Sequence, residues 1–228
     1  MANRTPFGVG EWYHCYSRGV DKRKTFQSIA DYKRFLQLLF LANEEKSTRR
    51  SDLKVSDTKL FSLDKGKSLV SIAAYVLMPN HFHILMQEGS EGGIAKFMQR
   101  VGIGYSQYFN KRNDRIGNLF VKPFRSKHID EDAYLKRVLQ YIHLNAAELY
   151  DPDFKLGRVN NLKQLLKKVE EYPFSSLSDY YGANRPEGII LSQEAKRAFQ
   201  DDLPDFEKLL QESLEYYEEM NIESKIRG

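Results

Sequence analysis

The chain has 228 residues, a lone cysteine (Cys15) and a net charge of +4, which divides into +10 over residues 1–198, −8 over residues 199–223 and +2 over residues 224–228. This length suffices for one domain with a sizeable core, the lone cysteine excludes an intramolecular disulfide, and no stretch is apolar for long enough to predict a membrane span or a signal peptide. We therefore expect a cytoplasmic protein whose basic part binds a polyanion such as nucleic acid.

The first predicted strand, residues 12–18, alternates between two faces of a sheet. One face would carry Trp12, His14, Tyr16 and Arg18. His14 is then either a metal ligand or a histidine that lines the sheet. Ser28 is expected to cap a helix that extends to about residue 45, and the polar residues 46–67 to form a long exposed loop, either a nucleic-acid contact or a flexible insertion.

Residues 71–86 predict a buried strand, a Pro-Asn turn and a second strand that folds back on the first. Two histidines follow the turn. On the second strand His81 and His83 share one face, while Phe82 and Ile84 share the other and can pack into a core. The two imidazoles either bind one metal ion together or are polar side chains on a half-exposed strand. A metal site would also need a third ligand from elsewhere in the chain.

Residues 92–112 predict a helix, and basic residues alternate with aromatic ones in the segment that follows it. Such a segment favours phosphate contacts and base stacking, although a solvated turn would have the same composition. The basic residues that we expect to contact nucleic acid are Arg18, Lys111, Arg112, Arg115, Lys122, Arg125 and Lys127.

A helix predicted from about residue 131 to 149 carries Tyr141 and Asn145 on one face, one turn apart. An amide oxygen from Asn145 could complete the metal site and leave the Tyr141 hydroxyl beside whatever the metal polarises. Packing alone is the alternative for Tyr141. It explains less well why asparagine, a weak helix former, lies in the middle of a helix.

The acidic residues 199–223 predict a helix with one apolar stripe, formed by Phe206, Leu209, Leu210 and Leu214. If this helix docks by its stripe beside the basic face, its carboxylates compete with the phosphates of a bound nucleic acid. Otherwise it packs far from that face or forms a dimer contact.

Several segments together resemble the REP-associated tyrosine transposases, within the single-tyrosine HUH transposases. The resemblance covers roughly residues 11–182 and rests on Tyr13–Gly19, Met78–Leu85, Tyr108–Arg112 with Gly117–Phe120, Tyr134–Asn145 and Tyr172–Ser176. It implies that His81 and His83 bind a divalent metal, Mg²⁺ or Mn²⁺, that Asn145 is the third ligand, and that Tyr141 attacks single-stranded DNA. The products would be a 5′-phosphotyrosine and a free 3′ hydroxyl, at sites that bear a hairpin.

The same resemblance implies an α+β fold, a ferredoxin-like antiparallel sheet with helices packed on one face, over residues 1–182. Residues 183–228 would form an acidic helical tail, and the protein would be a monomer or a homodimer. One departure concerns Asn145-Ala-Ala-Glu148, where the family usually has a proline and then a basic residue. A DNA-facing base is therefore expected to be lost.

Two other functions fit the same residues. The chain could be a non-catalytic nucleic-acid-binding module with structural histidines, or a metal-dependent nuclease that uses water while Tyr141 only packs. A covalent protein–DNA adduct would exclude both, and cleavage without an adduct would favour the nuclease.

Overall fold

The computed structural model describes residues 6–46, 48, 50–200, 203 and 205–226, with the backbone alone for residues 51, 58 and 217–226. Two acids of the tail, Asp201 and Asp202, thus lie outside the described residues, as do the side chains of Glu218, Glu219 and Glu223. No helix within these ranges is long and apolar enough to cross a membrane.

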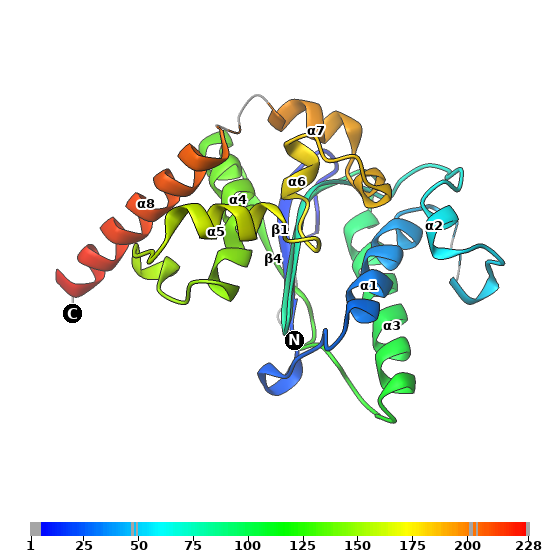
Figure 1. Cartoon of the computed structure of the whole chain (residues 1–228). Helices are drawn as coiled ribbons and strands as arrows, with labels where there is room; N and C mark the ends of the chain where they lie inside the picture. The colour runs from blue at the N-terminus through cyan, green and yellow to red at the C-terminus, as the bar shows by residue number, and fades with distance from the viewer. Residues whose placement is uncertain (1–5, 47, 49, 201–202, 204, 227–228) are drawn as a thin grey trace.

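A four-stranded sheet forms the centre of the molecule (Figure 1). Its strands are β1 (Trp12–Arg18), β2 (Val70–Met78), β3 (His81–Glu88) and β4 (Arg125–Ile129). They lie in the order β2-β3-β1-β4, and all neighbours are antiparallel. The α+β class with an antiparallel sheet is thus confirmed.

The helices are α1 (Ile29–Ala42), α2 (Asp57–Leu60), α3 (Gly93–Arg112), α4 (Asp132–Leu144), α5 (Leu162–Glu170), α6 (Leu177–Tyr180), α7 (Gln193–Gln200) and α8 (Phe206–Ile226). Short 3-10 turns are η1 (Val20–Lys22), η2 (Arg50–Asp52), η3 (Asn145–Leu149), η4 (Phe154–Leu156) and η5 (Pro186–Ile190). The predicted start of α1 at Ser28 is confirmed, because Asp31 accepts the backbone N–H of Ser28 at 2.9 Å.

Helices α1 and α3 cover one face of the sheet, where Phe82 packs on Phe35 with ring centroids 4.9 Å apart. The opposite face carries His81 and His83, and we call it the histidine face. The sheet register puts Ala74, Val76 and Met78 of β2 on this face as well, and all three are buried.

Helix α4 crosses the histidine face (Figure 1), so the expectation of helices on one face alone is corrected. The physical reason is the apolar part of that face, which must be covered from water. The stripe Leu135, Val138, Leu139 and Ile142 of α4 covers it, and these four side chains are buried.

The outer edge of β2 is covered by two later segments. Leu77 donates to the carbonyl of Phe174 at 2.9 Å, and Ser176 donates to the carbonyl of Tyr75 at 2.9 Å. Further along, Ser192 donates to Ile72. These hydrogen bonds satisfy backbone groups that an open edge would leave unpaired.

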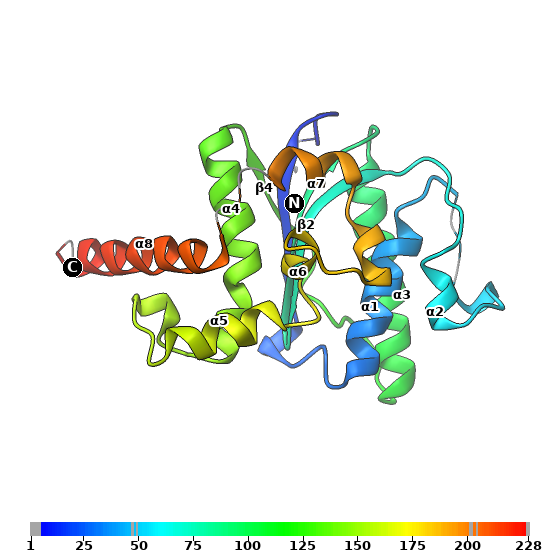
Figure 2. The ribbon, with the colours of Figure 1, turned by 45° about the horizontal axis from the view of Figure 1, so that its top comes forward.

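The acidic segment forms α8, which docks by the predicted stripe against α4, α5 and η4. Leu209 and Leu210 are fully buried, with Phe206 and Leu214 partly buried beside them. Figure 2 shows α8 running outward past α4. The tail helix therefore begins beside the helix that carries Tyr141.

Candidate functional site

The candidate site lies where β3 meets α4 on the histidine face. His81 and His83 alternate with core residues along β3, and their ring centroids are 5.1 Å apart with planes at 88°. Tyr141 of α4 meets His83 edge to face, with ring centroids 5.4 Å apart and planes at 85°. The strand period of two puts both histidines on one face, and the crossing of α4 over that face brings Tyr141 to His83.

Each histidine is oriented by a second polar group through its Nδ1 atom. His81 Nδ1 donates to Asn80 Oδ1 at 2.6 Å, so the turn before β3 fixes the tautomer of His81. His83 Nδ1 is hydrogen-bonded to Nε2 of His14 at 2.8 Å. The Nε2 atoms of His81 and His83 take no part in these bonds, which is the arrangement usual for metal-ligating histidines.

The histidines are neutral at physiological pH. Burial lowers the pKa of His81 and of His14 to about 4, and it holds the pKa of His83 well below 6.5. Neutral imidazoles can donate an electron pair to a metal ion without first losing a proton.

Asn145 completes the cluster from the end of α4. The α-helix stops at Leu144, and Asn145 opens the 3-10 turn η3. The side chain is 2% exposed, and neither its amide nitrogen nor its oxygen has a hydrogen-bond partner of ordinary geometry among the described residues. A buried amide in that state is unusual and needs a partner.

The amide of Asn145 lies close to Tyr141 and to His81. Burial raises the pKa of Tyr141, and the neighbouring Asn145 amide acts in the opposite direction. For His81, burial lowers the pKa and Asn145 again opposes it. The protein thus holds Tyr141 as a neutral phenol, with a polar group beside its hydroxyl.

The donor set suits a divalent ion with mixed nitrogen and oxygen ligands. His81 and His83 offer ring nitrogens, and Asn145 offers an amide oxygen that has no other partner among the described residues. Within the part of the chain that the structure describes, no cluster of three or more His, Cys, Asp or Glu side chains could hold a metal. The residues present therefore fit a metal only if an amide or further oxygen ligands take part.

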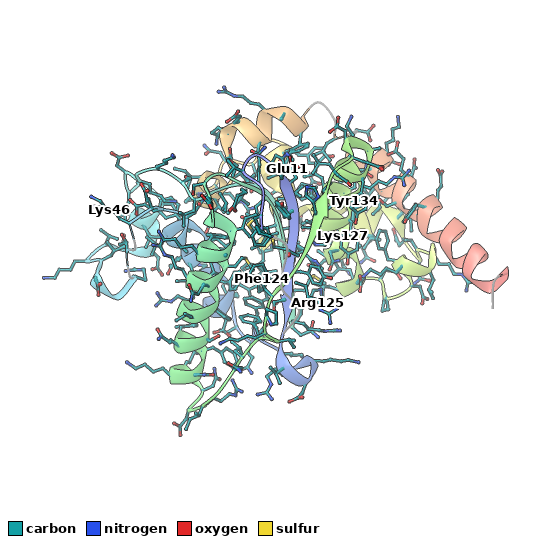
Figure 3. All side chains as sticks on the ribbon, turned by 180° about the vertical axis from the view of Figure 1, so that it is seen from behind. Glu11, Lys46, Phe124, Arg125, Lys127 and Tyr134 are labelled. Atoms are coloured by element: carbon teal, nitrogen blue, oxygen red, sulfur yellow. The ribbon has the colours of Figure 1, made fainter. Side chains whose placement is uncertain are left out.

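Three of the predicted DNA-contacting residues lie on the histidine face. Arg18 is opposite His81 in the β1–β3 register, and Arg125 and Lys127 of β4 are opposite Tyr16 and His14. Lys127 places its Nζ 4.3 Å from the ring centre of Tyr134, and Figure 3 shows these two side by side.

The other four predicted DNA-contacting residues lie away from the histidines. Lys111 and Arg112 end α3, which packs on the opposite face of the sheet, and Arg115 and Lys122 follow in the next loop. Arg112 is paired with Asp31 at 2.5 Å, and Arg115 donates to the side chain of Asn110 at 2.8 Å.

Lys155 is a site residue that the sequence interpretation missed. It lies on η4, pairs with Glu148, and places Nζ 5.5 Å from the ring centre of Tyr141. Burial and the neighbouring Arg18 lower the pKa of Lys155. Ala147 stands where the family that the chain resembles usually has a basic residue. Lys155, ten residues after Asn145, brings a cation back beside Tyr141. No local pattern in the sequence signals this return.

Comparisons with known proteins show the family and the fold of the chain. Residues 32–145, half of the chain, match the model of a family described as "Transposase IS200 like". No curated protein sequence matches the chain. A solved structure described as "Structure of the REP associates tyrosine transposase bound to a REP hairpin" is similar with a TM-score of 0.50, over 82% of this chain and 90% of that one. The sequence identity is 14%, so the likeness shows a shared fold.

Proposed function

Because the chain belongs to the family of IS200-like transposases, we propose that it cleaves and rejoins single-stranded DNA through a 5′-phosphotyrosine on Tyr141. One observation carries the proposal. Tyr141 packs edge to face on His83, and the buried amide of Asn145, which has no hydrogen-bond partner of ordinary geometry among the described residues, lies beside its hydroxyl. The similar transposase structure is bound to a REP hairpin, which supports hairpin-bearing DNA as the substrate.

In the proposed reaction the Tyr141 Oη atom attacks the scissile phosphorus. The new O–P bond forms as the bond to the 3′ oxygen breaks, and the 3′ oxygen leaves as a hydroxyl after taking up a proton. Burial raises the pKa of Tyr141, so the phenol is neutral at pH 7 and loses its proton as it attacks. The reverse attack by a 3′ hydroxyl rejoins DNA without an added nucleotide.

His81, His83 and Asn145 would hold the metal ion, Mg²⁺ or Mn²⁺. When bound, such an ion acts as a Lewis acid on the scissile phosphate. The three side chains contribute neutral donors that are already oriented, because Asn80 and His14 fix the two rings and η3 fixes the asparagine. Orientation of this kind reduces the free energy needed to assemble the site.

Cations of the protein would neutralise the DNA backbone. Lys155 and Arg18 flank the histidines, and both lower the pKa of His81 by their charge. We propose that they bind the phosphate beside Tyr141, and that Arg125 and Lys127 follow the strand along β4. Lys155 then takes the place of the base that the Ala-Ala-Glu148 sequence lacks. The four basic residues that lie away from the histidines remain predicted DNA contacts: Lys111, Arg112, Arg115 and Lys122.

A covalent-capture assay tests this function. The full chain is mixed with Mn²⁺ and a pool of hairpin oligonucleotides whose single-stranded flanks are randomised. The label is at the 3′ end, because the phosphotyrosine stays on the 3′ fragment. We expect a covalent band on a denaturing gel for the wild type and for Tyr150→Phe, a matched change at an exposed tyrosine, and none for Tyr141→Phe.

The other outcomes identify the rival functions. Cleavage without a covalent band would indicate a nuclease that uses water. Binding without cleavage would indicate a nucleic-acid-binding module. A band that persists in Tyr141→Phe would assign the nucleophile to another residue.

A further inference from the structure

A pocket of about 720 Å³ opens directly beside the candidate site. Tyr141 and His83 line one side of it, and Lys127, Tyr134 and Arg137 line another. The remaining wall comes from α8, through Glu212, Ser213 and Tyr216. A pocket of this size is typical of a site for a small organic ligand or a part of a larger one.

The chemistry of the lining suits a nucleotide. Tyr134 on α4 and Tyr216 on α8 offer aromatic rings, and Tyr216 is 46% exposed. Lys127 lies over the Tyr134 ring, and with Arg137 it adds positive charge for a phosphate. Aromatic faces for a base and cations for its backbone are the combination by which proteins bind single-stranded nucleic acid.

Glu212 gives the pocket a hydrogen-bond acceptor. A carboxylate repels phosphates, so its presence here does not serve backbone binding. A carboxylate does accept a hydrogen bond from an amino group on the edge of a base, such as N4 of cytosine. Glu212 has an ion pair with Lys208 at 3.9 Å through its Oε1 atom, and a carboxylate has a second oxygen that can accept a hydrogen bond.

The α8 wall is anchored firmly in the protein. Leu209 and Leu210 are fully buried against α4, α5 and η4, and Glu212 and Tyr216 follow on the same helix within two turns. This wall lies beyond residues 32–145, which carry the family match. The pocket therefore adds a surface that the matched part of the chain does not form alone.

We propose that this pocket holds one unstacked base of the DNA strand next to the scissile phosphate. Tyr134 and Tyr216 provide the stacking surface, and Glu212 selects a base with an amino group, in particular cytosine. The inference rests on the proposed function for the path of the strand past Tyr141. It assigns base selection to α8, the acidic tail helix.

The test measures binding in a chain that cannot react. Fluorescence anisotropy of the full chain with Tyr141→Phe compares a labelled dC dodecamer with an abasic dodecamer that has the same backbone. Tyr134→Ala and Tyr216→Ala should each weaken binding of the dC dodecamer by roughly 5- to 100-fold, the range of base–aromatic stacking. Binding of the abasic dodecamer should not change. Tyr150→Ala, at a tyrosine that is also exposed but does not line the pocket, should change neither.

A second variant tests base selection and does not depend on removing a ring. Glu212→Gln should reduce the preference for the dC over the dT dodecamer. An equal loss of affinity for the dC and abasic strands in the tyrosine variants would overturn the proposal, as would unchanged dC binding. Because binding is read without catalysis, this result is separate from the covalent-capture assay, which alone decides the proposed function.

Discussion

Replacing Lys155 by alanine removes a cation that lies beside the Tyr141 ring. The fold should survive this change, because the ion pair with Glu148 is partly exposed, with 38% of the lysine side chain accessible. Pairs of this kind contribute about 0–1 kcal/mol to stability. A larger loss of reaction rate in the variant therefore reflects a lost contact with DNA rather than a loss of folded protein.

The loss of rate expected for Lys155→Ala follows from the charge of Lys155 and the polarity of its surroundings. At an effective dielectric constant of about 20, two unit charges about 4 Å apart attract by about 4 kcal/mol. Solvent and Glu148 weaken the attraction between Lys155 and a phosphate, so we expect a net contribution of about 2 kcal/mol, within the range for hydrogen bonds to charged groups. This corresponds to a rate of adduct formation lower by about 30-fold.

The assay is the single-turnover rate of covalent adduct formation at saturating DNA. Lys155→Arg should restore most of the rate, and Lys163→Ala, at an exposed lysine on α5, should leave it unchanged. Combining Lys155→Ala with Glu148→Gln removes the carboxylate that the single change leaves unpaired. If the single variant reacts as fast as the wild type, Lys155 does not bind the reacting phosphate. If the single variant is slow and the double variant forms the adduct at the wild-type rate, repulsion between Glu148 and the phosphate explains the lower rate.

Four further predictions address the metal, the fold and the tail. His83→Ala, or a chelator, should abolish adduct formation, while the same change at the exposed His128 should not; undiminished cleavage in chelator would exclude the metal site. Asn145→Asp should tighten Mn²⁺ binding in calorimetry and Asn145→Leu should weaken it, and equal affinities would remove Asn145 from the ligand set. Burial lowers the pKa of His143 from 6.5 to about 3, so between pH 7 and pH 5 a proton binds this side chain only in the unfolded chain, and unfolding becomes easier. His143→Gln should therefore make the loss of unfolding free energy between pH 7 and pH 5 smaller by about 2 kcal/mol than in the wild type; an equal loss in both chains would refute this. Leu210→Ala should lower the free energy of urea unfolding by about 2–5 kcal/mol, and a smaller effect would mean that α8 docks weakly.

The faces of the strands could be predicted from the sequence, because a period of two fixes which side chains share a face. His81 and His83 indeed lie on one face, with Phe82 in the core on the other. The stripe of α8 was predicted on the same grounds, from the helical period. The boundary after residue 182, in contrast, stays a prediction.

Other features depend on contacts between distant segments, which no local pattern encodes. The sequence left His14 open between ligand and lining residue, and only the β1–β3 pairing brings it to the Nδ1 atom of His83. Coverage of the histidine face by α4 depends on the crossing of a helix over β2 and β3. Lys155 lies beside Tyr141 only because η4 folds back on α4, and no pattern near Tyr141 in the sequence indicates this contact.

Peptide mapping of the covalent adduct tests the central claim most directly. Trypsin should release residues 138–155 as one peptide, since no lysine or arginine lies between Arg137 and Lys155. After nuclease digestion of the DNA, fragmentation in the mass spectrometer separates its two tyrosines, Tyr141 and Tyr150. We predict a nucleotide joined through its 5′ phosphate to Tyr141. A nucleotide on Tyr150 or on any other peptide, or cleaved DNA with no modified peptide, would contradict the proposed mechanism.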